Sequence, residues 1–265
     1  MKILFIGDIF ARPGRKLLQK ILPEVIAEHQ PDIVIGNVEN LAGGKGVNRR
    51  SLQEIASSGV DVFTGGNHSF DNLDGNEVYQ DSSFPLLRPA NFPRGTPGRG
   101  WGIFTAKNGE RLLLISLLGR TFMPQHADSP FHCVEDVLAQ VPEDEYDVSM
   151  IDFHAEATSE KHALLWKYNG RITAIVGTHT HVPTADADIT PAGTAFQSDA
   201  GMNGSLDSCI GIKSDLVIKK LMDQMPLKYE VETTGRMQFN GVLIETQGRN
   251  ATKIQHLRKV ISRLS

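Results

Sequence analysis

The first seventy residues alternate apolar runs with helix-forming segments, and this rhythm limits the possible folds more than any other feature. The apolar runs are "KILFIGD", "DIVIGN" and "VDVFTGGNH". Each reads as a buried strand, and each is followed or preceded by a segment with helical periodicity. A strand–helix–strand–helix–strand order predicts parallel strands joined by right-handed crossovers, and therefore an α/β fold.

The two intervening helices carry their own boundary signals. Pro13 suits the first turn of a helix that runs to about "EVIAEH", whereas Pro23 inside it predicts a kink or a break. In "NRRSLQEIASSG", Asn48 is the expected N-cap and Gly59 the expected stop.

The pattern changes after residue 99. "GWGIFTAKNGERLLLISLLG" predicts a hairpin that turns at Asn108-Gly109. "YDVSMIDFH", "SEKHALLWKY" and "ITAIVGTH" predict a strand, a helix and a strand, and "ADITPAGTAFQSD" a second hairpin. The helix "SDLVIKKLM" then precedes an antiparallel end made of "KYEVETTGRMQFNGVLIETQ" and "ATKIQHLRKVIS". We expect one α/β domain over residues 1–265, with two mixed sheets packed together and helices outside.

Composition narrows the class of protein. The formal net charge is −4, which argues against stable binding of long nucleic acids because such binding depends on basic contacts. Cys133 and Cys209 are the only cysteines and form no CxxC pair, so we expect two reduced, buried thiols. The N-terminus lacks a signal-peptide pattern and the run "LLLISLLG" is too short for a bilayer. These features predict a cytoplasmic protein without a membrane partner.

Polar side chains of the metal-ligand type stand where the predicted strands end. Ligands of open α/β sheets bind outside the carboxyl ends of the strands, so side chains placed there are candidates for a common site. There are five such clusters: Asp8, Glu39 with Asn40, Asn67 with His68, His154, and His179 with His181.

Each cluster alone also has a structural interpretation. Asp8 could cap a helix, Glu39 could lie in a turn, and His154 could be a hydrogen-bonded core histidine. The pair His179 and His181 is the most specific signal, because residues i and i+2 of an extended segment point to one side and two neutral imidazoles can face a cation. Coincidence in all five clusters is the weaker explanation.

The donor set points to a centre with two metal ions. Carboxylate and amide oxygens together with imidazole nitrogens suit Fe, Mn, Zn or Co. A carboxylate can bridge two cations, and two metals about 3.5–4 Å apart can clamp the attacking and leaving oxygens of a phosphoryl transfer. They also lower the pKa of a bound water toward ~7, which supplies a hydroxide nucleophile.

At this point the sequence resembles a known family. The order D…NVEN…GNH…H…GTHTH is similar to the calcineurin-type metallophosphoesterase superfamily, and most of all to its bacterial YmdB-like branch. The similar blocks run from residue 3 to about residue 187, and "SDAGMNGSLDSCIG" continues the likeness. They are "FIGDIF", "NVENLAGGKG", "GGNHSFD", "LRPANFPRGTPG", "GRTFMPQ", "DFHAEATSEK" and "VGTHTHVPTAD".

The resemblance implies a four-layer α/β/β/α sandwich and a metal-dependent phosphodiesterase that acts on 2′,3′- and 3′,5′-cyclic nucleotides. Iron is the metal implied, with manganese as a common substitute. One ion would be held by Asp8, Glu39, Asn40 and His181, and the other by Glu39, Asn67, His154 and His179. Glu39 would bridge them, and His68 would protonate the leaving oxygen.

The sequence departs from the wider superfamily pattern at two points. Phe10 stands where a histidine is usual, and Glu39 stands in place of the usual bridging aspartate. A longer carboxylate can span the same gap, and Asn40 can replace the ligand missing at Phe10. The allocation of ligands to the two ions follows from the resemblance alone.

Several alternatives stay open. A phosphomonoesterase or nucleotidase has the same metal motifs, and a metal-containing regulatory or RNA-binding protein with little catalysis is a rival from another class. The loop around Gly43–Gly46, with Lys45, Arg49 and Arg50 in or after it, is either a solvated loop or a phosphate contact. Loop hydrogen bonding is the expected role of Arg88, Asn91 and Arg120, and an edge strand in "QFNGVLIETQ" would allow a homo-oligomer.

Overall fold

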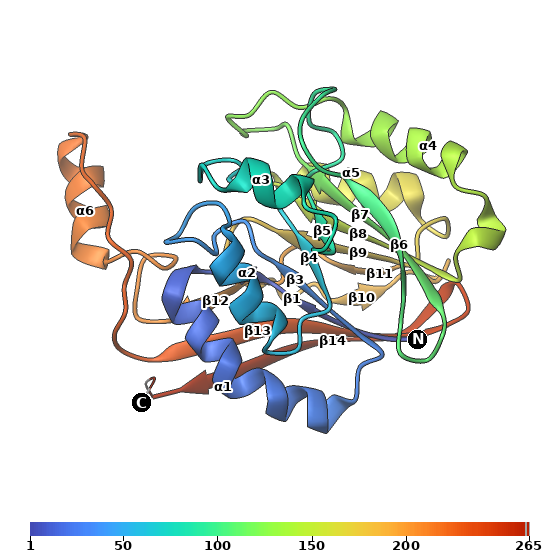
Figure 1. Cartoon of the computed structure of the whole chain (residues 1–265), viewed down its shortest axis with the longest axis horizontal. Helices are drawn as coiled ribbons and strands as arrows, with labels where there is room; N and C mark the ends of the chain where they lie inside the picture. Colours follow the sequence, from blue (N-terminus) through green and yellow to red (C-terminus); the bar gives the residue numbers. More distant parts are fainter. Residues whose placement is uncertain (263, 265) are drawn as a thin grey trace.

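The computed structural model describes residues 1–262 and 264, and two β-sheets lie face to face at its centre (Figure 1). The strands of the larger sheet are β1 (Lys2–Ile6), β2 (Asp8–Ile9), β3 (Ile33–Asn37), β4 (Val62–Thr64), β5 (Leu86–Leu87), β12 (Met202–Ser205), β13 (Met237–Gln247) and β14 (Asn250–Ile261). Those of the smaller sheet are β6 (Trp101–Thr105), β7 (Arg111–Leu118), β8 (Val148–His154), β9 (Ala174–Thr178), β10 (Asp188–Ile189) and β11 (Ala195–Gln197).

Six α-helices lie outside the two sheets in the described part of the chain. They are α1 (Ala11–His29), α2 (Arg49–Ala56), α3 (Gly75–Gln80), α4 (Pro130–Gln140), α5 (Thr158–Tyr168) and α6 (Ser214–Asp223). A short 3-10 helix, η1 (Glu143–Glu145), precedes β8. The larger sheet packs against α1 and α2, and the smaller against α4 and α5 (Figure 1). The predicted α/β/β/α sandwich of two mixed sheets is confirmed.

Strand order keeps the parallel strands next to one another in each sheet. The larger sheet runs β2-β12-β13-β1-β3-β4-β5, with β14 beside β13, and β1, β3, β4 and β5 are parallel. The smaller sheet runs β10-β11-β9-β8-β7-β6, with β7, β8, β9 and β11 parallel. The carboxyl ends of each parallel set therefore gather at one edge of its sheet.

Strand β1 shows how the sequence builds these layers. Its side chains alternate between two buried environments. Ile3 and Phe5 lie in the core between the two sheets, whereas Leu4 and Ile6 lie in the core beneath α1. A strand that is covered on both faces has to be apolar throughout, which is why "KILFI" reads as one continuous run.

The predicted boundaries of α2 are confirmed, whereas the break predicted within α1 does not occur. Asn48 caps α2 as predicted, with its side chain accepting from the backbone N–H of Ser51 at 2.9 Å, and Gly59 has a positive φ of 106° three residues after the helix ends. The break predicted at Pro23 is absent, because α1 continues through it. Pro23 lies on the exposed side while the buried stripe, which includes Leu22 and Val25, packs on both sides of it.

Both predicted hairpins form, and the antiparallel end differs from its prediction. Gly109, with φ 89°, turns β6 into β7, and β10 pairs antiparallel with β11. The prediction placed a strand from Lys228 onward. Strand β13 begins only at Met237, and the residues before it lie outside the strand. Strand β13 lies between β14 on one side and β1 and β12 on the other. The prediction that "QFNGVLIETQ" offers a free edge is therefore wrong.

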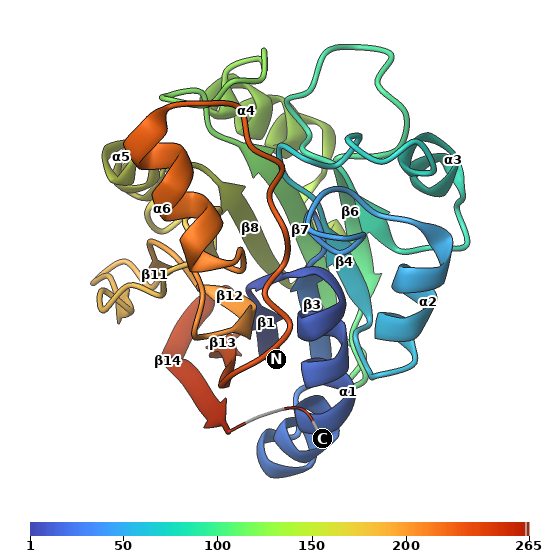
Figure 2. The ribbon, with the colours of Figure 1, turned by 90° about the vertical axis from the view of Figure 1, so that its left-hand side faces the viewer.

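Helix α6 stands apart from the sandwich. Figure 2 views the molecule from the end at which α6 projects, and α6 and the chain after it lie in front of the strand ends. None of the residues of α6 is buried. Among the described helices, none has the length and apolarity needed to cross a bilayer.

Candidate active site

The structure brings all five polar clusters to one place. Asp8 follows β1, Glu39 and Asn40 follow β3, and Asn67 and His68 follow β4. From the smaller sheet, His154 ends β8, and His179 and His181 follow β9. The carboxyl ends of the two sheets thus contribute to one shared cluster, whose donor atoms lie within 4.8 Å of one another in two groups of three.

The first group consists of Glu39, His154 and His179. The Nε2 atom of His154 lies 3.1 Å from Glu39 Oε2, 3.0 Å from His179 Nδ1 and 2.9 Å from the Oδ1 atom of Asn67. One imidazole nitrogen carries at most one proton and cannot satisfy three such neighbours. Donor atoms crowded in this way fit a cation placed among them.

The second group consists of Asp8, Glu39 and His181. His181 Nε2 lies 3.1 Å from Asn40 Oδ1 and 3.9 Å from Asp8 Oδ1. Asp8 is fully buried, and its Oδ1 atom has no hydrogen-bond partner among the described residues. A buried carboxylate oxygen without a partner is costly, and a bound cation is what would satisfy it. Glu39 belongs to both groups, as a bridging carboxylate would.

Burial and neighbouring charges raise the pKa of Asp8 and of His154 and lower the pKa of His179. Burial raises the pKa of Asp8 to about 6, against the opposing effect of His181. Burial alone lowers the pKa of His154, but Glu39 outweighs it and brings that pKa to about 9. Burial, together with the neighbouring His154, lowers the pKa of His179 to about 3. His179 is therefore neutral at physiological pH and has a lone pair available for a cation.

The backbone at the two histidines differs from the extended strand assumed from the sequence. Strand β9 ends at Thr178, and His179 and His181 have positive φ values of 102° and 66°. The turn is held by two hydrogen bonds, from His179 N–H to Asp8 Oδ2 at 3.2 Å and from His181 Nδ1 to the carbonyl of Ile210 at 3.1 Å. It directs the two imidazoles into different groups, and such strained backbone is concentrated at functional sites.

A buried carboxylate that the sequence analysis missed orients His154. Asp152 accepts hydrogen bonds from Asn37 Nδ2 at 2.9 Å, from Thr178 Oγ1 at 2.8 Å and from Thr64 Oγ1. The Oγ1 atom of Thr178 lies in turn 2.9 Å from His154 Nδ1, which leaves Nε2 for the cluster. The signal was present in "DFH", because residues two apart on a strand share a face.

Two further features fix the loops around the site. Lys161 Nζ forms a buried ion pair with Asp199 Oδ2 at 3.0 Å, and the same oxygen accepts from the backbone N–H of Thr180 at 3.0 Å. Thr180 lies between the two histidines, so this pair anchors their turn. A Cβ atom on Gly66 would overlap the Glu39 carboxylate, so only glycine fits there.

A cavity of about 480 Å³ opens in front of the two groups. His68 lies on its wall, with Nδ1 2.7 Å from Asp71 Oδ2 and its backbone N–H donating to Glu39 Oε2 at 3.0 Å. The apolar part of the wall consists of Phe10, Ile210, Ile212 and Tyr229. A phosphate at the metal groups would therefore have an apolar surface beside it.

In the loop that follows the Glu39 cluster, Lys45 alone of the three basic residues lines the cavity. Arg49 is paired with Asp81 at 2.6 Å, and Arg50 with Glu54 at 3.2 Å. The sequence left phosphate contact and a solvated loop open as alternatives. Lys45 has a longer contact of its own, 3.8 Å from Asp71 Oδ2, and its place in the cavity lining makes it the candidate among the three for a phosphate contact.

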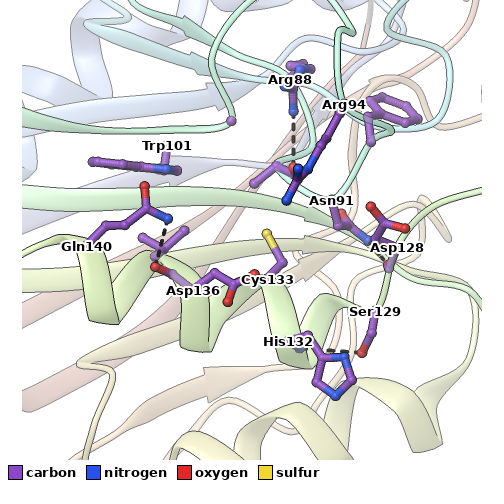
Figure 3. Close-up of a pocket in the computed structure, with 14 residues that line it drawn as sticks. Arg88, Asn91, Arg94, Trp101, Asp128, Ser129, His132, Cys133, Asp136 and Gln140 are labelled. Atoms are coloured by element: carbon purple, nitrogen blue, oxygen red, sulfur yellow. Dashed lines mark hydrogen bonds between the residues drawn. The ribbon is translucent and has the colours of Figure 1, made fainter.

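Arg88 and Asn91 line a second cavity, also of about 480 Å³, beside α4 (Figure 3). Asn91 Nδ2 donates to the carbonyls of Leu118 and Asp128, and Arg88 donates to those of Pro89 and Ala90. These are the expected loop hydrogen bonds.

Cys133 lies in the same cavity (Figure 3) and burial raises the pKa of its thiol to about 11. Both cysteines are free as predicted, although each is only partly buried. The backbone N–H of Arg120, at another surface, donates to both carboxylate oxygens of Glu160 at 3.0 Å.

The fold is that of the calcineurin-like phosphoesterases. A calcineurin-like phosphoesterase from Bacillus subtilis superimposes with a TM-score of 0.61 over 99% of this chain and 90% of that one, at 11% identity. The likeness to that structure shows a shared fold, and in this chain the cluster of carboxylates and imidazoles lies at the strand ends of that fold.

Sequence similarity identifies a family that is narrower than this fold. The family model described as YmdB-like protein matches residues 4–257. A Bacillus subtilis (strain 168) protein named 2′,3′-cyclic-nucleotide 2′-phosphodiesterase is 41% identical over 97% of this chain and 96% of its own length. A hypothetical protein of Thermus thermophilus has a crystal structure with a TM-score of 0.92, at 36% identity over 98% of this chain and 99% of that one. The chain belongs to the YmdB-like family.

Proposed function

We propose that this protein hydrolyses the phosphodiester bond of cyclic nucleotides, 2′,3′- or 3′,5′-linked, at a centre of two metal ions. The observation that carries the proposal is the position of Glu39 in both donor groups beside the unpartnered buried oxygen of Asp8. The name of the Bacillus subtilis relative supports the substrate class.

Seven side chains would hold the ions. Asp8, Glu39, Asn40 and His181 surround one position, and Glu39, Asn67, His154 and His179 surround the other. Oxygen and imidazole ligands of this kind suit iron, with manganese as a substitute. When bound, the two ions would supply Lewis acidity toward the phosphate and a hydroxide nucleophile at neutral pH.

The leaving ribose oxygen needs a proton, and we assign its donation to His68. Its ring lies on the cavity wall and its Nδ1 atom is held by Asp71 at 2.7 Å. The contact between Asp71 and Nδ1 fixes the ring and leaves Nε2 for proton transfer to the leaving oxygen.

Replacing His68 with alanine should lower kcat on a cyclic nucleotide by about 10²–10⁴-fold, the usual contribution of a general acid. The variant should keep its metal content, because His68 belongs to neither donor group. Activity on bis-p-nitrophenyl phosphate should fall much less, since p-nitrophenolate leaves without a proton. Steady-state kinetics on both substrates tests this, and equal losses on the two would exclude the proton-donor role.

The apolar wall of the cavity favours a nucleotide as the substrate, because it offers a surface for the base. Tyr229 is 40% exposed and lines the cavity together with Ile210 and Ile212. Stacking of a base on an aromatic ring is worth about 1–3 kcal/mol. Lys45, in the same cavity, is available for a phosphate oxygen.

We therefore expect Tyr229→Ala to raise KM for cyclic nucleotides by about tenfold, with kcat little changed, as loss of one stacked base predicts. Tyr229→Phe keeps the ring and should restore KM. A diester without an aromatic group is the control substrate and should show no change. An equal rise in KM for that control would mean that Tyr229 does not contact the base.

The rival on the same fold is a phosphomonoesterase. Comparing rates on bis- and mono-p-nitrophenyl phosphate with Mn²⁺ separates the two activities, and the proposal requires the diester to be the better substrate. A protein that binds two metals but turns over neither compound would favour the regulatory alternative instead.

A further inference from the structure

Residues 210–230, here called the arm, form an extension of the chain between β12 and β13. The arm contains α6, which projects from the sandwich in Figure 1 and lies in front of the strand ends in Figure 2. It is joined to the body through the bridge between Ile212 and Val231. No residue of α6 is buried.

The arm also concentrates the exposed apolar side chains of the molecule. Six of the eleven large exposed apolar residues in the described chain belong to it: Ile210, Ile218, Leu221, Met222, Met225 and Tyr229. Ile218, Leu221 and Met222 follow the spacing i, i+3 and i+4, which places them along one side of α6, and Met225 lies just beyond the helix end, after Gln224 with its φ of 54°. They are exposed by 52, 72, 78 and 65%, and we call them the stripe.

A helix of this kind needs a partner. α6 has ten residues, and isolated helices shorter than about 12–15 residues are marginal in water. Most helices in proteins are stabilised by packing of their apolar side, whereas more than half of each side chain in the stripe is left exposed by the described residues. Scattered single apolar side chains need no explanation, but a continuous stripe marks an interaction surface.

We propose that the stripe is an interface with a second copy of this chain, packed helix to helix about a two-fold axis. In such a contact each stripe covers the other, so a single apolar surface is its own complement. The helix is about 15 Å long, and the flanking residues of the arm extend the contact toward the ~800 Å² per partner of a standard interface.

The charges of the arm favour a second copy over a charged partner. Its four lysines stand against Asp215, Asp223 and Glu230, a formal sum of only +1. Lys219 pairs with Asp223 at 2.7 Å and Lys213 with Glu230 at 2.6 Å. Two such arms do not repel each other, and the arm lacks the excess of basic residues that nucleic acids or anionic membranes attract.

Association would also complete the candidate site. The arm supplies Ile210 and Tyr229 to the cavity wall, and the carbonyl of Ile210 accepts from His181 Nδ1. Fixing the arm against a second copy would hold this wall in place. The proposal stands on the exposure of the stripe and is independent of the reaction that the site performs.

The mass of the protein in solution tests the interface. Size-exclusion chromatography with light scattering should give twice the 29.1 kDa of one chain. The double variant Leu221→Asp with Met222→Asp should give a single-chain mass. Trp166→Asp is the matched control, because Trp166 is 63% exposed on α5, outside the arm, and it should leave the mass doubled. Circular dichroism shows whether each variant is folded.

Two mass results overturn the proposal. One is a single-chain mass for the unaltered protein at up to about 50 μM, well above a micromolar Kd. The other is a doubled mass for a folded double variant, which would place the interface elsewhere. A single-chain protein in which the double variant at Leu221 and Met222, which do not line the cavity, raises KM would point to a lid over its own site.

Cross-linking gives an answer that does not depend on the folding of the aspartate variant. Met222→Cys, made in a background of Cys133→Ser and Cys209→Ser, should form a disulfide between two copies under mild oxidation. Trp166→Cys in the same background should remain single on a non-reducing gel. Absence of the Met222→Cys cross-link, or equal cross-linking in the control, contradicts the stripe-to-stripe contact.

Discussion

Replacing Glu39 with glutamine should remove both metal ions and nearly all activity. Glu39 is the only residue shared by the two donor groups among the described residues, so its loss weakens both positions at once. A neutral amide keeps the size of the side chain but cannot bridge two cations. Metal ions contribute several kcal/mol to such reactions, so kcat/KM should fall by about 10³-fold or more.

Metal analysis of the purified variant is the measurement, with Glu135→Gln as the control. Glu135 pairs with Arg171 on the surface, at 2.9 Å, and takes no part in either group. The control should retain its metal and its rate. Unchanged metal content in Glu39→Gln would rule out a bridging role for this carboxylate.

Replacing Asp8 with asparagine should raise the Tm of the metal-free protein and remove the rise in Tm that added metal gives. Asp8 is buried with one oxygen unpartnered, and such a group costs about 1–3 kcal/mol. Asp8→Asn removes the charge, so the metal-free variant should melt a few degrees above the metal-free parent protein. Added Mn²⁺ should raise the Tm of the parent protein and have little effect on the variant, because Asp8 belongs to the second donor group.

Asp152→Asn is the matched control for this experiment. Asp152 is equally buried, but its carboxylate accepts from Asn37, Thr64 and Thr178. Its replacement should therefore lower the metal-free Tm, whereas Asp8→Asn raises it. Thermal unfolding of both variants measures the difference, and a lower Tm in both would mean that Asp8 is stabilised within the chain itself.

The sequence predicted those parts of the fold that local pattern controls. The apolar runs of β1, β3 and β4 are buried on both faces, so their periodicity shows in the sequence. The polar residues at their ends were predicted to meet for the same reason, because parallel strands end at one edge. The cap at Asn48 and the turn at Gly109 could be predicted because helix capping and tight turns depend on only a few neighbouring residues.

Tertiary context decided what the sequence could not predict. The local rule for Pro23 was overridden by packing of the α1 stripe, and the pairing of β13 on both sides depends on strands distant in the chain. The role of Asp152 rests on partners from β3, β4 and β9. Helix α4 was missed although Ser129 and Pro130 are good start signals. That residues 1–265 form one domain, and the allocation of ligands to each ion, stay predictions.

The most direct test of the central claim is to assay anaerobically purified protein for metal content and for turnover of 2′,3′-cyclic nucleotides at the same time. We predict about two metal ions per chain, cleavage of the cyclic diester to a monophosphate, and no further attack on that product. Loss of activity on chelation and its return with Fe²⁺ or Mn²⁺ should accompany this result. Undiminished cleavage by metal-free protein, or faster release of phosphate from the monoester than cleavage of the diester, would contradict the account.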